Sequence, residues 1–182
     1  MRDTLIIAEA GVNHNGDISL AKKLIDIAVD AGANVVKFQS FKANRLVSKK
    51  ARKADYQIKN IGGDETQYKM LNDLELSIDQ AKLLNTYCKS KNILFCSTPF
   101  DIESLNELGE LNMPFIKIPS GEITNYPFLE KISKIRKQII LSSGMSSLNE
   151  INNAIKILTR YNLQKEDITV LHCNTEYPTP MN

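Results

Sequence analysis

Short runs of β-branched, aromatic and other apolar residues alternate along the chain with longer stretches that carry apolar residues at helical spacing. Such alternation is typical of βα units, in which parallel strands are joined by helices that cover the sheet. The runs expected to form strands are residues 4–9, 34–40, 93–97, 114–118, 138–142 and 168–172. The sequence therefore predicts an α/β fold built around parallel strands.

Helix starts are marked by short polar motifs between these runs. Ser77 with Gln80, and Ser147 with Glu150, have the spacing of a capping box, in which two side chains bond free N–H groups at the start of a helix. Asp101 follows a predicted strand and is a candidate N-cap for a third helix. We expect helices to begin at these three places.

The longest connection, residues 43–76, contains a basic run of Lys49, Lys50, Arg52 and Lys53. A connection of this length in a compact domain is more often functional than idle. No aromatic stacking pattern accompanies the basic run, so we interpret it as a solvated face rather than as a site for a polyanion.

Composition limits what the chain can bind. Its 182 residues are 42% hydrophobic and 24% charged, which fits one soluble globular domain, and the net charge of +2 gives no strong field for nucleic acid. No run of 18 apolar residues and no signal-peptide pattern is present, so we expect no membrane partner and a cytoplasmic location. Cys88, Cys96 and Cys173 lack CxxC spacing and are expected to be free, buried thiols.

Polar side chains gather at the C-terminal end of every predicted strand, where a hydrophobic core does not need them. In α/β folds the ligand site lies at these ends, and in a TIM barrel several strands build it together. We therefore expect one shared site. The candidates are Glu9, Lys37, Gln39, Ser97, Thr98, Lys117, Ser120, Glu122, Ser142, Ser143, His172, Asn174 and Thr175.

Lys37 and Lys117 are the most informative of these candidates, because each lies inside an apolar strand. Residues two apart in a strand point the same way, so Lys37 should share a face with Gln39. A buried lysine is costly unless an anion neutralises it. Two lysines directed into one cavity, with hydroxyls around them, predict an anionic ligand such as a phosphate.

Each candidate also has a purely structural interpretation. A single lysine in a strand is most often at an edge with its amine in water, and a single glutamate at a strand end often helps to cap a helix. Ser142 and Ser143 precede Gly144 and could be turn residues. His14 and His172 are far apart, and isolated histidines more often satisfy backbone groups than bind metal.

The polar strand ends lie in six motifs that resemble, in order and over essentially the whole chain, those of the bacterial sialic acid synthases. This family includes the N-acetylneuraminate synthases and their legionaminic and pseudaminic acid relatives. The motifs are IIAEAGVNHNG (6–16), VKFQSFKA (36–43), STPFD (97–101), IKIPSGEITN (116–125), LSSGM (141–145) and LHCNTEYPTP (171–180).

The resemblance implies a TIM (β/α)8 barrel that condenses phosphoenolpyruvate with the open-chain aldehyde of an N-acetylated mannosamine-type sugar and releases phosphate by C–O cleavage. It implies Glu9 and Glu122 as the catalytic glutamates, with Glu122 also on the sugar side beside Gln39 and Tyr177. The residues implied for phosphoenolpyruvate binding are Lys37, Thr98, Lys117, Ser120, Ser142, Asn174 and Thr175, with either Asn174 or Thr175 making the last phosphate contact.

Length sets the chain apart from this family. Family members continue past the position of Asn182 with two further βα units, which carry the histidines that bind Mn²⁺ or Mg²⁺, and with an antifreeze-like domain that reaches into the partner subunit of a homodimer. Residues 1–182 correspond to the first six βα units, so we expect no metal ligands among them and unpaired outer edges on the first and sixth strands. We therefore expect either a truncated chain or one of poor independent stability.

Several alternatives remain open from the sequence. The acceptor sugar is N-acetylmannosamine, which we favour modestly, or a 2,4-diacetamido-6-deoxymannose-type sugar that gives N,N'-diacetyllegionaminate. A Schiff-base aldolase would also place a lysine such as Lys117 beside a glutamate. A 3-deoxy-keto-acid phosphate synthase would need additional basic residues for a second phosphate. A noncatalytic sugar-binding or scaffold fragment is the alternative outside enzymes.

Overall fold

The computed structural model describes residues 4–52, 66–175 and 179. All of the runs expected to form strands do so, with small differences at their ends. The strands run parallel to their neighbours, which confirms the predicted α/β class. They are β1 (Ile7–Gly11), β2 (Val35–Ser40), β3 (Leu94–Pro99), β4 (Ile116–Ile118), β5 (Ile139–Ser142) and β6 (Ile168–Leu171).

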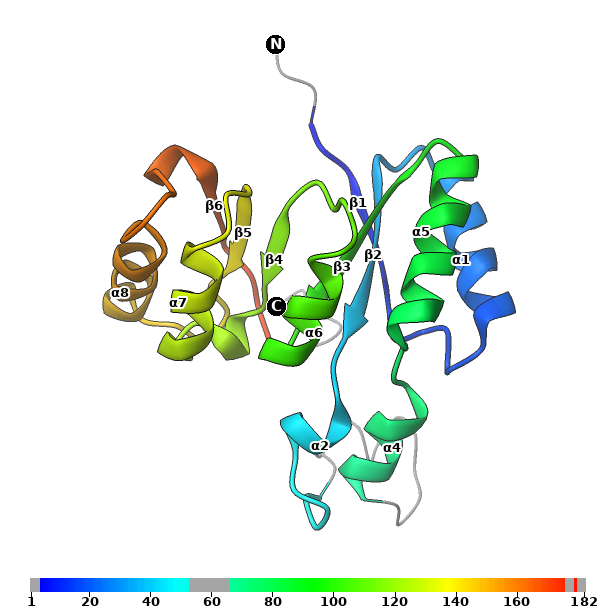
Figure 1. The fold of residues 1–182 in the computed structure, drawn as a ribbon, viewed down its shortest axis with the longest axis horizontal. Coiled ribbons are helices and arrows are strands. Elements are labelled where there is room, and N and C mark those ends of the chain that lie inside the picture. Colours follow the sequence, from blue (N-terminus) through cyan, green and yellow to red (C-terminus); the bar gives the residue numbers. More distant parts are fainter. Residues whose placement is uncertain (1–3, 53–65, 176–178, 180–182) are drawn as a thin grey trace.

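The strands form two three-stranded sheets, β1-β2-β3 and β4-β5-β6, which lie side by side in Figure 1. In the described residues, β1 pairs only with β2 and β6 only with β5, so each has one free edge, as predicted. Contacts to sulfur join β3 to the segment that leads into β4. The Ser97 N–H donates to Met113 Sδ at 3.3 Å, and Cys96 Sγ lies 4.0 Å from the Phe115 carbonyl oxygen.

Helices cover the two sheets separately (Figure 1). Helices α1 and α5 pack together beside β1-β2-β3, α7 and α8 pack together beside β4-β5-β6, and α2 and α4 lie beyond the C-terminal end of β2. The helices are α1 (Ile18–Asp30), α2 (Ala43–Leu46), α4 (Gln67–Asp73), α5 (Ile78–Ser90), α6 (Ile102–Leu108), α7 (Tyr126–Ser133) and α8 (Leu148–Leu158), with 3-10 turns η1 (Ser120–Glu122) and η2 (Lys165–Asp167).

The expected helix starts are all confirmed. Ser77 and Ser147 form complete capping boxes with the side chains three residues later, and Asp101 accepts from the Ser104 N–H at 2.8 Å at the start of α6. Asp17 and Asn125 cap α1 and α7 in the same way and were not anticipated. Side-chain oxygens therefore satisfy free N–H groups at the start of the helices that follow β1, β3, β4 and β5.

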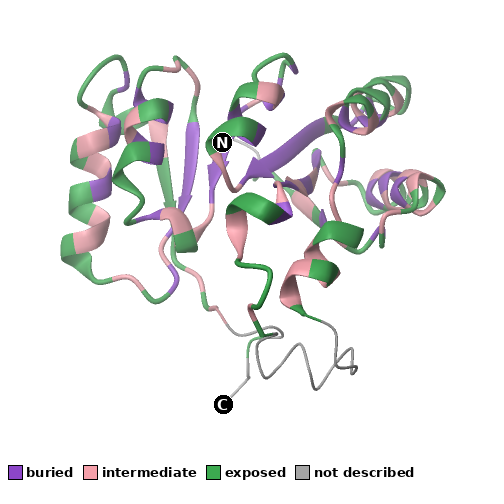
Figure 2. Ribbon diagram, turned by 60° about the horizontal axis from the view of Figure 1, so that its bottom comes forward, coloured by how far each residue is buried: buried purple, intermediate pink, exposed green. Residues whose placement is uncertain are grey.

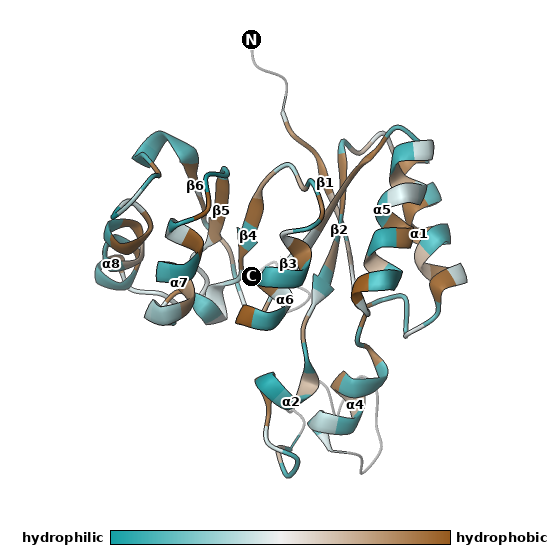
Figure 3. Cartoon of the chain, in the orientation of Figure 1, coloured by the Kyte–Doolittle hydropathy of each residue, from teal (hydrophilic) through white to brown (hydrophobic). Residues whose placement is uncertain are grey.

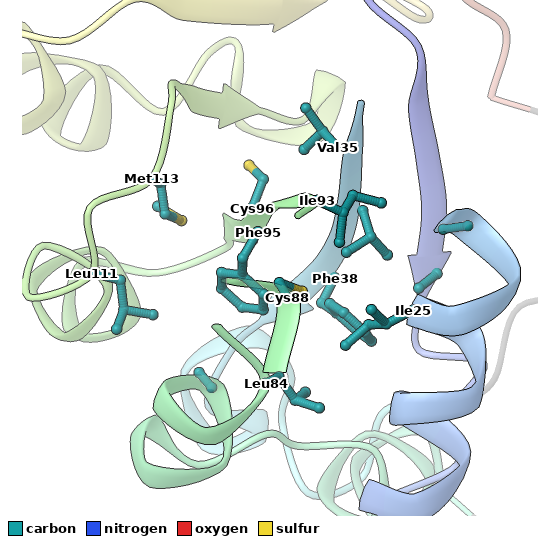
Figure 4. Close-up of a cluster of buried hydrophobic side chains, with 14 of the residues drawn as sticks. Ile25, Val35, Phe38, Leu84, Cys88, Ile93, Phe95, Cys96, Leu111 and Met113 are labelled. Carbon is teal, nitrogen blue, oxygen red and sulfur yellow. The ribbon is translucent and has the colours of Figure 1, made fainter. Parts of the chain in front are cut away.

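The hydrophobic core has two parts, because each sheet buries its own helix layer. Ile25, Phe38 and Leu84 are fully buried where α1 and α5 meet the first sheet, as Figure 4 shows. A second cluster includes Phe128 and Leu141 and joins α7 to the second sheet. Figures 2 and 3 show the same pattern for the inner strands, which are buried and apolar, and for the helices, which are polar on their outer faces, whereas β6 at its free edge is largely exposed.

The long connection contains α2 and α4, and residues 53–65 between them lie outside the described residues. Lys49, Lys50 and Arg52 are exposed, in agreement with a solvated face, whereas Lys53 lies outside the described residues.

The capping box of α8 gives a test of the fold. We expect Ser147→Ala to lower the free energy of unfolding by about 1 kcal/mol, because Ser147 Oγ accepts from the Glu150 N–H and no other oxygen replaces it. Urea unfolding measures the change. Ser90→Ala is the control, since its exposed hydroxyl donates to the Tyr87 carbonyl at the end of α5 and caps no helix start. Equal destabilisation by both variants would contradict the assignment.

Candidate active site

The inner face of the strands carries a layer of polar side chains near their C-terminal ends. Strand alternation places Lys37 and Gln39 of β2 on this face, and the register pairs them with Cys96 and Thr98 of β3. Lys117 of β4 joins the same layer. The structure thus brings together residues that are far apart in the chain, as the sequence predicted.

Lys37 is held by one carboxylate and one hydroxyl. Its Nζ forms an ion pair with Glu9 Oε2 and donates to Thr98 Oγ1 at 3.2 Å. Gly11 has φ +54°, and a Cβ added there would lie 3.4 Å from Glu9 Oε1 and 3.6 Å from Gln39 Nε2. The positive φ favours glycine at this position, and the Glu9 and Gln39 side chains both reach the space beside it.

Lys117 is buried, and no carboxylate among the described residues pairs with it. Its Nζ donates to Ser142 Oγ at 2.7 Å and to the carbonyl oxygen of Ile118 at 3.1 Å, and the residue is only 9% exposed. Burial, with a smaller contribution from the positive charge of Lys37, lowers the pKa of Lys117 to about 8, while the charge of Glu9 opposes the shift. The site therefore contains a cation whose charge is only partly balanced.

Cys96 lies between the two lysines. Burial raises the pKa of its thiol to about 12, although the positive charges of Lys37 and Lys117 both oppose this rise. The thiol is therefore neutral at ordinary pH. The sequence predicted a free, buried cysteine, which is confirmed for Cys96 and also for Cys88, whereas Cys173 is only half-buried. What the sequence did not reveal is that Cys96 separates the lysines.

Ser120 and Thr175 meet above Gly144. A Cβ added to Gly144 would lie 2.7 Å from Thr175 Cγ2 and 3.3 Å from Ser120 Oγ, so only glycine leaves space for both side chains. Asn174 and Thr175 also line a cavity of about 500 Å³ together with His172. These hydroxyls lie beyond β4, β5 and β6, so the second sheet contributes its own polar groups to the C-terminal side.

Among the described residues, no contact joins Glu122 to the lysines. Its Oε2 accepts from Asn125 Nδ2 at 2.6 Å, and both residues line a second cavity of about 560 Å³. None of its described contacts reaches Glu9, so the two candidate glutamates stand in different surroundings. Tyr177, the remaining sugar-side candidate, lies outside the described residues.

The described residues do not form a metal site on their own. No group of three His, Cys, Asp or Glu side chains among them could hold an ion. His14 is fully buried next to the Phe38 ring, its Nδ1 accepts from the Gly16 N–H at 3.0 Å, and burial lowers its pKa. His14 therefore bonds the backbone of the β1–α1 turn through Nδ1, while its buried Nε2 has no hydrogen-bond partner among the described residues.

The metal-binding histidines implied by the family resemblance were expected beyond Asn182. Asn182 itself lies outside the described residues, as do residues 176–178, 180 and 181. The position of the metal site relative to Asn182 therefore stays a prediction.

Comparison with known proteins agrees with this geometry. Residues 24–182 match the model of the NeuB family. The chain belongs to that family. It is 56% identical over its whole length to the N,N'-diacetyllegionaminic acid synthase of Campylobacter jejuni and covers 54% of that protein. It is 46% identical to the protein of the same name from Legionella pneumophila, with 95% of this chain and 49% of that protein aligned.

A solved structure shows the same arrangement of elements. The N-acetylneuraminic acid synthetase of Leptospira borgpetersenii superposes with a TM-score of 0.80 and 33% identity over 99% of this chain and 57% of that one. The chain thus spans about half the length of the curated relatives that it matches. Among its described helices, none has the length and apolar character needed to cross a membrane.

Lys117 gives a pH-dependent test of the site. Its pKa is lowered from 10.5 to about 8, so between these values the unfolded chain binds a proton that the folded chain lacks. The free energy of unfolding therefore increases as pH rises through that window, because deprotonation of Lys117 favours the folded chain. Below pH 8 we expect Lys117→Met to be the more stable protein by up to about 3 kcal/mol.

This advantage should shrink as pH rises from 8 to 10.5, and urea unfolding at a series of pH values measures it. Lys134→Met is the control, because Lys134 is exposed and pairs with Glu130 on the surface of α7. A constant difference between wild type and Lys117→Met across the window would show that the Lys117 pKa is not lowered.

Proposed function

We propose that the protein containing this chain condenses phosphoenolpyruvate with the open-chain aldehyde of an N-acetylated mannosamine-type sugar. The products are a nine-carbon 2-keto sugar acid and phosphate. The observation that carries this proposal is the pair of lysines, Lys37 and Lys117, on one face of the strands and surrounded by hydroxyls. The proposal includes the arrangement of β1 to β6 as the first six strands of a TIM barrel.

Phosphoenolpyruvate carries a phosphate and a carboxylate, and each needs a cation. Lys117, with only neutral acceptors, binds one of these groups, and Lys37 binds the other. Thr98 and Ser142 already contact the lysine amines, so their hydroxyls are placed to bond the same oxygens. Ser120 and Thr175 supply further contacts from above Gly144, with Asn174 next to them.

The glutamates carry out the proton transfers that the chemistry needs. Attack by C3 of phosphoenolpyruvate on the aldehyde is followed by addition of water at C2 and loss of phosphate, and both the new alkoxide and the water exchange protons. Glu9 stands beside Lys37 at the phosphoenolpyruvate end. Glu122 stands at the cavity that would receive the sugar, with Gln39 near Glu9.

The acceptor that we favour is a 2,4-diacetamido-6-deoxy sugar. The sequence alone gave a modest preference for N-acetylmannosamine, but two relatives at 56% and 46% identity are named N,N'-diacetyllegionaminic acid synthases. We also propose a divalent metal ion, which would polarise the aldehyde, and a homodimer, both formed with chain beyond Asn182. The described residues offer no set of ligands for the metal.

The proposal is tested by phosphate release from phosphoenolpyruvate, measured with Mn²⁺ present on the longest natural chain that contains this sequence. We expect release that depends on the sugar and is fastest with the diacetamido compound. Release with N-acetylmannosamine alone would return the assignment to N-acetylneuraminate synthesis. No release with either sugar by a folded protein would contradict the proposed function.

Glu122→Gln separates catalysis from binding. The substitution keeps the shape of the side chain and removes its base, so kcat should fall by about 100-fold or more while the Kd for phosphoenolpyruvate changes little. Glu110→Gln, which removes a surface carboxylate paired with Lys82, should leave both values unchanged. Parallel losses of turnover and phosphoenolpyruvate affinity in Glu122→Gln would indicate a structural glutamate instead.

One observation favours a second candidate, the Schiff-base aldolase. A lysine with a pKa of about 8 beside another cation is also suited to attack a carbonyl group as a neutral amine. The two oxygen acceptors around Lys117 Nζ favour the ammonium form, and hence the anion site. Borohydride trapping of a pyruvate adduct on Lys117, without phosphate release from phosphoenolpyruvate, would favour the aldolase.

A further inference from the structure

The cavity of about 560 Å³ beside Glu122 is a distinct feature of the C-terminal side. Its walls come from α2, from the start of α6 and from the η1–α7 segment. The residues between Lys117 and Glu122 belong to both regions, since they begin at the buried lysine and end in the cavity wall. The segment from Lys117 to Glu122 thus joins the buried lysine to the cavity wall along the chain.

Several contacts hold the walls in place. The Phe100 N–H donates to the carbonyl oxygen of Ser40 at 3.0 Å, and the Phe41 ring meets the Phe100 ring edge-on at 6.3 Å. Asp101 Oδ2 accepts from the Lys42 N–H at 2.9 Å. The end of β2 is thus joined to the start of α6 by backbone, ring and carboxylate contacts, so the apolar Phe100 surface is positioned before any ligand arrives.

The charges that line the cavity do not suit an anion. Arg45 is its only lysine or arginine among the described residues, and the Arg45 Nε pairs with Glu103 Oε2 at 3.3 Å. Asp101 and Glu122 add two further carboxylates. Three carboxylates against one guanidinium disfavour a phosphate and favour an uncharged group.

The remaining lining matches an acetamido group. Leu46 and Phe100 offer apolar surface for a methyl group, and the exposed amide of Asn106 offers a donor for a carbonyl oxygen. The carboxylates nearby can accept from an amide N–H. N-acetylmannosamine has one acetamido group, whereas a 2,4-diacetamido sugar has two, and the second needs a place of its own.

We propose that this cavity receives the second acetamido group of a 2,4-diacetamido acceptor and determines the preference for that sugar. The assignment rests on the proposed synthase activity. Asn106 bonds the carbonyl oxygen, and Leu46 with Phe100 packs on the methyl group. Glu122 at the cavity wall keeps its proposed role in proton transfer, and Asp101 or Glu103 accepts from the amide N–H.

The test uses the longest natural chain that contains this sequence. Phosphate release gives kcat/KM for the 2,4-diacetamido-6-deoxy sugar and for the same 6-deoxy sugar with a 4-hydroxyl in place of the acetamido group. We expect the wild type to prefer the first by about tenfold or more. Asn106→Leu and Phe100→Ala should each reduce that preference about fivefold, through KM, and leave the 4-hydroxyl sugar almost unaffected.

Asn153→Leu is the matched control, because Asn153 is exposed on α8, which contributes none of the described residues that line the cavity. The Kd for phosphoenolpyruvate, measured on each variant, shows that the lysine site is intact. Asn106 is exposed, so Asn106→Leu should fold normally. The assignment is overturned if this variant lowers kcat/KM equally for both sugars, or lowers it for neither. Absence of release with both sugars in the wild type would instead overturn the proposed function itself.

Discussion

The ammonium group of Lys117 is buried, and burial disfavours its positive charge. Polar groups at the C-terminal ends of β4 and β5 surround it. Strand alternation requires that β4 place Lys117 on the inner face if its neighbours Ile116 and Ile118 are to pack outward. The amine is then satisfied by Ser142 on β5 and by its own strand's carbonyl group. The end of the second sheet is thus polar because a buried cation needs oxygen acceptors.

The two lysines differ in how their charge is balanced. Lys37 has the carboxylate of Glu9 beside it, whereas Lys117 has only neutral oxygens, and the charge of Lys37 reaches across Cys96 to act on Lys117. An anion that enters the site therefore gains most at Lys117. Binding would also stabilise the protonated form of that lysine, so ligand affinity and Lys117 ionisation are linked.

Local patterns in the sequence were enough to predict the strands, three helix starts and the common face of Lys37 and Gln39, because each depends on residues a few positions apart. The features that were not predicted depend on distant residues. Cys96 comes between the lysines only because β3 aligns with β2. Ser120 meets Thr175 over Gly144 only when β4, β5 and β6 are assembled.

The cavity beside Glu122 was missed for the same reason. Arg45 and Glu103 are far apart in the chain and meet only when α2 folds over the start of α6. In the sequence Arg45 stands near a basic run and gave no separate signal. Glu122 was predicted as a site residue, but its place in a cavity wall that does not include Glu9 could not be read from strand-end positions alone.

The most direct measurement of the central claim is calorimetric binding of phosphoenolpyruvate at about pH 9 in buffers of different ionisation enthalpy, on wild type and Lys117→Met. If Lys117 has a pKa of about 8 and faces the anion, the wild type should take up most of one proton on binding. Lys117→Met should take up almost none and bind more weakly by about 2 to 4 kcal/mol. Tight binding without proton uptake, or unchanged affinity in the variant, would contradict the account.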